Sequence, residues 1–339
     1  MVWFWLKKVS TYLLVLVGLS ILIFIIARIV PGDPARLALG PRTPEETVQR
    51  LRQEMNLDKP IYLQYVLWVN GVLHGDFGKS LMTRRSVRED IREFLPATLE
   101  MVMISALLMI VGGITLGILS AKFSNTWLDG VIRIISYLGI VAPAFVWAII
   151  FMFVFGYLLP IFPITGRLSY GIIEPKFITG MYMIDGFLGG SLNTVKDAFM
   201  HLLLPAVALC LGGLAQAARI TRSSMTDNMT KDYISAQKAY GIPEKVILFK
   251  YLLKPSLIPT ISVLGLDIAA LFGNAFLVEL IFNFSGISKY GIQAMLNKDI
   301  NVISAVVMIL GLVFISVNIA IDIVVAFLDP RIRLMGRSA

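Results

Sequence analysis

The stretch VSTYLLVLVGLSILIFIIARIV (residues 9–30) decides the fold, because Arg28 is its only charged residue. A hydrocarbon core about 30 Å thick needs about 20 apolar residues of helix, and this run has the required length. It is too long for the apolar part of a signal peptide, and the following PGDPAR (31–36) offers no small-residue cleavage site. We therefore interpret it as a retained transmembrane anchor, with Arg28 close enough to its end to reach the membrane surface.

The composition of the 339-residue chain suits a membrane better than water. Hydrophobic residues make up 57% of the chain and charged residues only 15%, whereas soluble domains carry about 25% charged residues. The net charge is +8, but the basic residues flank apolar segments, which indicates membrane topology and not nucleic-acid binding. A single cysteine, Cys210, excludes a disulfide framework.

Six apolar segments are long enough to span a bilayer, so the sequence predicts an all-α, polytopic membrane protein with six transmembrane helices. The six segments are Val9–Val30, Thr98–Ala121, Val131–Leu159, Leu202–Arg219, Ser256–Phe282 and Val302–Leu328.

Lysine and arginine in short connections predict the orientation, because they favour the cytoplasmic side. They collect before the first segment, at Lys122, between the fourth and fifth segments, and after the sixth segment. We expect a multi-pass protein of the plasma (inner) membrane with both termini in the cytoplasm. The predicted parts are 1–30 (N-terminus and first helix), 31–97 (extracytoplasmic), 98–328 (core with five helices, including the cytoplasmic connection 226–259) and 329–339 (cytoplasmic tail).

The extracytoplasmic segment is expected to form a small ordered cap after the first helix. Thr43, Pro44 and Glu46 predict a helix start with Thr43 as N-cap, and Asn56 is a suitable C-cap. GDFGKS (75–80) ends like a phosphate-binding loop, but that motif requires glycine where Leu73 stands. Its expected place outside the cell also argues against a nucleotide site.

The connection TDNMTKDYISAQKAYGIPEKVILFKYLLKPSLIP (226–259) is too structured for a simple linker. Thr230 predicts the start of a helix over Lys231–Tyr240, Gly241 its left-handed end, and Pro243 the first residue of a second helix. Its face of Tyr233, Ala236 and Tyr240 has little to bury itself against within the chain. Two interpretations are open: the helix lies on the lipid surface, or it fills a groove on a cytoplasmic partner.

Three acidic residues lie inside predicted spans, where a charge costs about 2.5–3.5 kcal/mol on insertion scales. They are Asp267, Glu279 and Asp322. All three could accept hydrogen bonds between helices, Asp267 and Glu279 could instead line a translocation path, and Asp322 could pair with a basic residue of the cytoplasmic connection. Gly265, with Ala269 and Gly273, forms a stripe of small residues typical of close helix packing.

Catalytic functions find little support in the sequence. His74 and His201 stand far apart, without a metal-ligand cluster around them. Asp267 and Asp322 could be imagined as an intramembrane protease pair, but their flanking residues do not resemble protease motifs. The sequence therefore does not predict an enzyme.

Several motifs occur in the same order in one family. Ser235-Ala236-Gln237 precedes Gly241 with the spacing of an E-A-A-x-x-x-G motif, although Ser replaces Glu and Gln replaces the second Ala. The other matching segments are LPATLEM (95–101), VAPAFVW (141–147), HLLLPAVAL (201–209), VELIFNFSGISKYGIQAMLNKD (278–299) and DPRIR (329–333). Over nearly its whole length the chain resembles the permease subunits of type I, binding-protein-dependent ABC importers of the dipeptide/oligopeptide class.

The resemblance implies a function and partners. The connection would be a coupling helix that contacts a separate ATPase through Tyr233, Ala236, Gln237, Tyr240, Gly241 and Pro243. The translocation path would involve Asp267, Asn274 and Glu279. This chain would bind no cofactor, since ATP and magnesium would sit on one or two partner ATPase subunits. A second, non-identical permease and an extracytoplasmic substrate-binding protein would complete the complex in the lipid bilayer.

Two alternatives to a peptide permease stay open at this point. The same role could serve nickel or oligosaccharides, which relatives in this class also carry. An ion-driven secondary transporter is the alternative of a different class, and the connection 226–259 argues against it, because such a transporter has no use for a docking helix.

Overall fold

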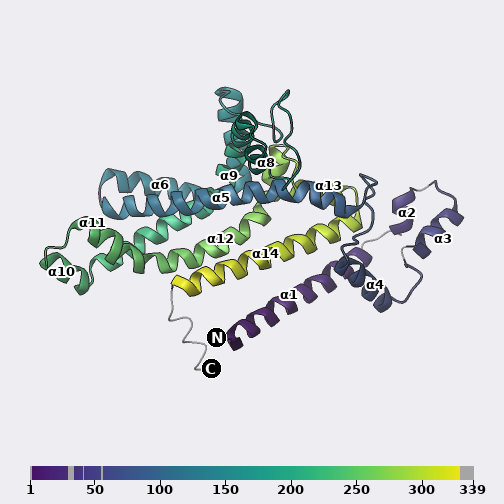
Figure 1. The fold of residues 1–339 in the computed structure, drawn as a ribbon, viewed down its shortest axis with the longest axis horizontal. Helices are drawn as coiled ribbons and strands as arrows, with labels where there is room; N and C mark the ends of the chain where they lie inside the picture. The colour runs from purple at the N-terminus through teal and green to yellow at the C-terminus, as the bar shows by residue number, and fades with distance from the viewer. Residues whose placement is uncertain (1, 30–33, 41, 55, 329–339) are drawn as a thin grey trace. The chain divides into compact units, whose positions relative to one another are not determined.

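The computed structural model describes residues 2–29, 34–40, 42–54 and 56–328, and the regular elements within them are helices (Figure 1). This confirms the predicted all-α fold. The chain divides into two compact units, one of residues 1–96 with 286–315 and one of residues 97–285 with 316–339. The predicted tail, 329–339, lies outside the described residues.

The first unit contains the anchor and the predicted cap. Its helices are α1 (Val2–Ile29), α2 (Pro34–Leu39), α3 (Glu45–Glu54), α4 (Ile61–Leu73), α13 (Ile287–Leu296) and the first parts of α5 (Val87–Lys122) and α14 (Ile300–Leu328). α4 packs against α1, where the hydroxyls of Ser20 and Tyr65 lie 2.8 Å apart and the rings of Phe24 and Tyr65 meet edge to face. The cap after the first helix is therefore helical, as predicted.

The predicted start of α3, with Thr43 as N-cap and Pro44 as first residue, is wrong by one residue. The helix begins at Glu45, and the Thr43 hydroxyl donates a 2.7 Å hydrogen bond back to the Leu39 carbonyl. Glu45 instead pairs with Arg36 of α2, so side chains on both helices close the turn between them. The predicted C-cap is confirmed: Asn56 has φ 54°, and the Leu57 amide bonds to the Arg52 carbonyl.

GDFGKS forms a structural connection within the first unit. The Ser80 hydroxyl donates a 2.8 Å hydrogen bond to Asp299, which is fully buried, and the Asn301 amide group donates to the Lys79 carbonyl. Gly78 has φ +81°, a backbone conformation that favours glycine, and a Cβ there would also displace the Asn301 side-chain amide, 2.9 Å away. The motif thus fastens the chain before α5 to the start of α14.

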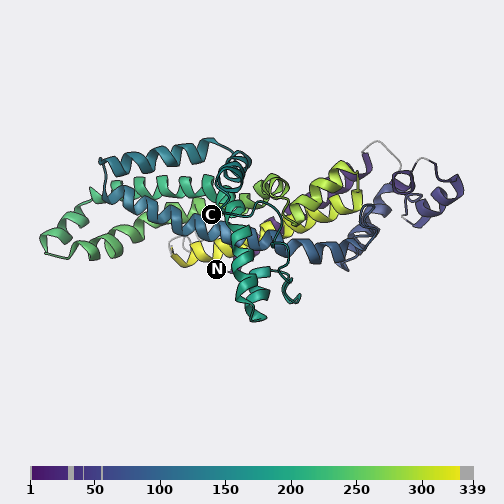
Figure 2. The same cartoon turned by 90° about the horizontal axis from the view of Figure 1, so that it is seen from above.

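The second unit is built around α9 (Leu192–Met229). α9 packs against α6 (Trp127–Val141), α7 (Ala144–Phe151), α8 (Tyr182–Leu188) and α12 (Leu253–Ile281). Figures 1 and 2 show α5, α6, α9 and α12 running side by side within this unit. Cβ atoms on Gly113 and Gly117 of α5 would lie 2.9 and 2.8 Å from backbone oxygens of α9, so this stripe of glycines permits the close approach of the two helices.

The third predicted span, Val131–Leu159, is not one straight helix. α6 ends at Val141, and α7 continues as a π-helix over Met152–Leu158, with a bend of 110° between the two halves. Pro143 follows Ala142, whose backbone is extended (φ −88°, ψ 128°), because a residue before proline is pushed out of the helical region. This segment is therefore either a broken span or a re-entrant loop.

The other predicted spans lie within long apolar helices. Five helices in the described part of the chain are long and apolar enough to cross a membrane, or up to six if the bent pair counts as one span. Helix ends differ from the predictions: α5 begins at Val87 and not at Thr98, and α9 extends the segment Leu202–Arg219 at both ends. Together with the composition, this makes the chain a multi-pass membrane protein.

Candidate functional site at the connection between α9 and α12

The connection between α9 and α12 contains a short, sharply ended helix. α10 covers Asp232–Ala239, and Gly241 follows with φ +71°. The Ile242 amide bonds to the Gln237 carbonyl and the Gly241 amide to the Lys238 carbonyl, which is the Schellman arrangement for ending a helix. The predicted role of Gly241 is confirmed.

Two predicted boundaries in this connection are corrected by the structure. Thr230 does not cap α10, because its hydroxyl donates to the Asp227 carbonyl at 2.9 Å and the helix starts two residues later. Pro243 is the N-cap of α11 (Glu244–Val246) and not its first residue. α11 passes through a π-helix, Ile247–Leu252, directly into α12, so the four-residue turn 240–243 is what separates α10 from this continuous helical segment.

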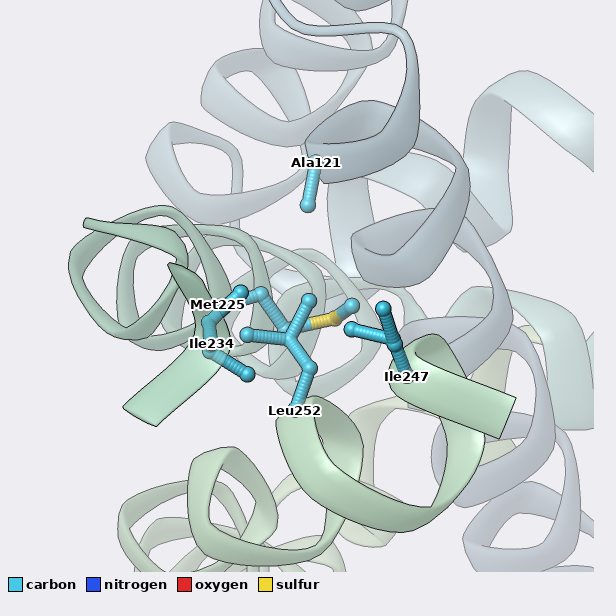
Figure 3. Close-up of a cluster of buried hydrophobic side chains, with 5 residues drawn as sticks. All are labelled: Ala121, Met225, Ile234, Ile247 and Leu252. Carbon is cyan, nitrogen blue, oxygen red and sulfur yellow. The ribbon is translucent and has the colours of Figure 1, made fainter. Parts of the chain in front are cut away.

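Ile234 anchors α10 to the rest of the second unit. Its side chain is 1% exposed and belongs to a cluster with Ala121, Met225, Ile247 and Leu252 (Figure 3). These residues come from the ends of α5 and α9 and from the π-helix before α12. The expectation that α10 has little to bury against within the chain is therefore wrong for this residue. α10 is attached where three long helices meet.

The face expected to meet a partner is open. Tyr233 is 41% exposed and Tyr240 84% exposed, Ala236 is also exposed, and Gln237 is partly buried. The Tyr233 hydroxyl donates to Asn228 of α9, whose side-chain amide donates in turn to Ser256 of α12. The structure thus gathers the predicted residues on one rigid projection, with small and aromatic side chains outward.

The three predicted path residues lie on α12 in different surroundings. Asp267 and Asn274 are seven residues apart, two helical turns, so they share a face. Asn274 is exposed, whereas Asp267 Oδ2 is buried without a hydrogen-bond partner among the described residues. Glu279 is fully buried and accepts a hydrogen bond from Thr98 of α5, so it links two helices and does not line an open surface here.

Close packing accounts for part of the small-residue stripe on α12. A Cβ on Gly265 would clash with Ile321 of α14, whereas a Cβ on Gly273 would meet nothing within 4 Å. Only the first of these two glycines is therefore needed for helix contact within this chain.

A buried ion pair near the connection was not expected from the sequence. Arg222 of α9 donates from Nε and Nη2 to both carboxylate oxygens of Asp129, which is fully buried at the start of α6. The sequence does place Asp129 just before the third apolar segment and Arg222 just after the fourth, both on the expected cytoplasmic side, and this placement could have suggested the pair. In the sequence, Arg222 is one of the basic residues between the fourth and fifth apolar segments that predict the orientation.

Comparisons with known proteins cover most of the chain. A family model described as "Binding-protein-dependent transport system inner membrane component" matches residues 113–334, and a model for the N-terminal part of such membrane components matches residues 1–102. The chain is 37% identical to the probable D,D-dipeptide transport system permease protein DdpB of Escherichia coli (strain K12), with 95% of each chain covered. It is 33% identical to the dipeptide transport system permease protein DppB of Alkalihalophilus pseudofirmus, with 94% of this chain and 96% of the relative covered. It is 30% identical to the glutathione transport system permease protein GsiC of Salmonella choleraesuis, with 97% and 98% covered.

Proposed function

Because the chain belongs to the family of inner-membrane components of binding-protein-dependent transport systems, we propose that it forms half of a peptide translocation path driven by separate ATPase subunits. The observation that carries the coupling part of this proposal is α10, which Ile234 fixes to the ends of the long helices while Tyr233, Ala236 and Tyr240 face outward. A projection of this kind can transmit the movement of a docked partner into α9 and α12, because Ile234 packs against Met225 of α9 and Leu252 directly before α12.

A peptide substrate is supported by the relatives. The similar proteins named above are described as dipeptide, D,D-dipeptide and glutathione permeases, and all three substrates are short peptides. Nickel and oligosaccharides are the competing substrates, and uptake assays with each class separate them.

The proposed orientation places α10 in the cytoplasm with both termini. It rests on the basic residues between α9 and α12, including Lys231, Lys238 and Lys245. In this orientation ATP and magnesium act on the partner ATPases, and this chain binds neither. A second permease, non-identical to this one, completes the path, and an extracytoplasmic binding protein delivers the substrate.

We assign the path-lining role on α12 to Asp267 and Asn274, which share a face of the helix. An unpartnered carboxylate oxygen beside a substrate path can accept hydrogen bonds from a peptide's amide or ammonium groups. Glu279, hydrogen-bonded to Thr98, instead holds α12 against α5.

The test is ATP-driven peptide uptake by the complete complex in vesicles. Ala236→Trp adds bulk to the outward face and is expected to lower uptake about tenfold, the effect of losing about 1.4 kcal/mol of docking free energy. Thr126→Trp places the same bulk on an exposed residue of the other short cytoplasmic connection and is expected to leave uptake unchanged. Undiminished uptake by Ala236→Trp, with the ATPases still co-purifying, would refute coupling through α10. Uphill transport by the chain alone in an ion gradient would favour a secondary transporter.

A further inference from the structure

We propose that a pocket between α5, α6 and α9 binds the phosphate of an anionic lipid headgroup at the membrane surface. The pocket has a volume of about 220 Å³ and lies entirely within the second unit. Its polar lining consists of three arginines and four hydroxyl-bearing residues: Arg133, Arg219, Arg222, Ser120, Ser136, Ser223 and Tyr137.

The charge balance of the pocket favours an anion. Asp129, the carboxylate that pairs with these arginines, is fully buried and already accepts both hydrogen bonds from Arg222, at 2.7 and 2.8 Å. Arg133 lies 3.9 Å from the same carboxylate and is half exposed, and Arg219 is exposed with one hydrogen bond to Gln216. One carboxylate cannot neutralise three guanidinium groups, so positive charge remains at the pocket.

The chemistry of the lining suits a phosphate. Guanidinium groups present parallel N–H donors that match two phosphate oxygens, and the hydroxyls of Ser136 and Tyr137 add further donors. The pocket is smaller than the ~300–1,000 Å³ typical of sites for whole small molecules, so a headgroup phosphate fits it better than a nucleotide.

The surroundings of the pocket indicate a membrane lipid as the source of this phosphate. The pocket opens beside α6, whose outward side chains are apolar: Ile134, Ile135 and Leu138 are each more than half exposed. Trp127, 78% exposed at the first turn of α6, is the residue type that collects at the membrane interface. Acyl chains can therefore lie along α6 while the phosphate reaches the arginines.

This inference requires only that α5, α6 and α9 enter the bilayer. The assignment to the inner leaflet rests on the orientation given under the proposed function. A lipid held there would steady the end of α9 from which α10 extends.

The experiment measures lipid binding by native mass spectrometry on the intact transport complex in neutral detergent. Palmitoyl-oleoyl phosphatidylglycerol is titrated against phosphatidylcholine with the same acyl chains, and the phosphatidylglycerol is expected to bind more tightly. Arg133→Gln with Arg219→Gln removes two charges and leaves the Arg222–Asp129 pair in place, since Arg133 lies 3.9 Å from Asp129 and Arg219 bonds to Gln216. At about fivefold per arginine near an anionic lipid, the double variant is expected to weaken phosphatidylglycerol binding about 25-fold.

The matched control is Lys196→Gln, which removes an exposed charge near the opposite end of α9 and is expected to change binding less than twofold. Equal affinity for the two lipids, or equal weakening by Lys196→Gln, overturns the proposal. Displacement of the lipid by millimolar inorganic phosphate would also overturn it in favour of a soluble anion. The lipid-binding measurement needs neither peptide nor ATP. A negative result would therefore overturn the lipid site and leave the proposed transport function standing, and a failed uptake assay would leave the lipid site standing.

Discussion

Arg222 and Asp129 form a two-pronged ion pair that ties the C-terminal half of α9 to the first turn of α6. The Nε–Oδ1 and Nη2–Oδ2 distances are 2.7 and 2.8 Å, and the Ser120 hydroxyl of α5 adds a third hydrogen bond to the carboxylate at 2.6 Å. The carboxylate is fully buried. A buried charge with three donors from two other helices therefore helps to fix the position of α6 against α5 and α9.

Removing one partner of this pair should destabilise the protein more than removing both. Asp129→Leu leaves Arg222 unpaired and is expected to lower the free energy of unfolding by about 3 kcal/mol. The double variant Asp129→Leu with Arg222→Leu should regain much of that loss, because no uncompensated charge remains. Thermal unfolding in detergent measures the stability of the single and the double variant. Arg133→Gln, whose side chain is 51% exposed and 3.9 Å from Asp129, is the control and should change little. Additive losses in the double variant would contradict this account of the pair.

The anchor of α10 can be separated from its outward face by two substitutions. Ile234→Ala removes a side chain that is 1% exposed and should cost about 2–5 kcal/mol at that site. We expect faster amide hydrogen exchange over α10 together with reduced uptake. Tyr240→Ala, at an 84% exposed position, should leave the exchange unchanged and weaken only ATPase docking. If both variants changed exchange equally, Ile234 would not be the anchor.

Replacing a glycine of α5 by alanine should lower the stability of the protein, whereas the same replacement in α6 should raise it. Gly117→Ala places a Cβ 2.8 Å from the Ala218 carbonyl oxygen of α9, so overpacking should cost about 1–3 kcal/mol. Gly130→Ala meets nothing within 4 Å and should stabilise the protein by about 0.4–1 kcal/mol, because alanine restricts the unfolded chain. Thermal midpoints of the two variants, compared with the unchanged protein, check the signs. A loss of stability in both would show that α6 packs more tightly than described.

The apolar segments were predictable from the sequence because membrane crossing requires an uninterrupted stretch of apolar residues. The break after Val141 was not, since both halves of Val131–Leu159 are equally apolar and hydropathy does not report a bend. Pro143 does indicate a helix break, but the length of the apolar run favoured a single span. Helix ends were missed for a related reason: α9 continues past Arg219 to Met229, because a helix outside the bilayer needs no apolar residues.

At the candidate site, local turn chemistry was readable and tertiary burial was not. Gly241 was predicted because a left-handed residue ends a helix wherever it occurs. Ile234 was overlooked because one apolar residue in a polar helix shows no periodicity, and its partners Ala121 and Met225 lie far away in the sequence. Asp129 and Arg222 were missed likewise, since nothing local to either residue reveals the other.

Gly241 allows the shape of the connection to be tested separately from its packing. A Cβ there would meet nothing within 4 Å, so the cost of substitution is the backbone conformation at φ +71°. Gly241→Val should cost about 1–2 kcal/mol locally and reduce uptake, whereas Gly241→Asn should retain it, because asparagine tolerates the left-handed region. Gly273→Ala, also in open space but inside α12, is the control for loss of a glycine. Equal uptake by the Val and Asn variants would rule out a conformational requirement.

The loop before α8 should loosen in acid, because its turn depends on the ionised Asp185 carboxylate. Asp185 is 1% exposed and accepts hydrogen bonds from the Thr179 hydroxyl and from the amides of Ile178, Thr179 and Gly180. Burial opposes the charged form, but these donors outweigh it and hold the pKa of Asp185 below its usual value. The unfolded aspartate titrates near pH 3.9. The stabilisation is therefore complete above about pH 4 and is lost as the pH falls through the lower folded pKa.

Amide hydrogen exchange of Thr179 and Gly180 between pH 7 and pH 3 measures this loosening, after correction for the intrinsic pH dependence of exchange. Asp185→Asn places N–H groups against N–H donors and should cost about 1–3 kcal/mol at pH 7. The difference between the two proteins should shrink as the pH falls, because protonation weakens the unchanged loop while the asparagine does not titrate. A difference that stayed constant from pH 7 to pH 3 would mean that the charge of Asp185 does not hold the turn.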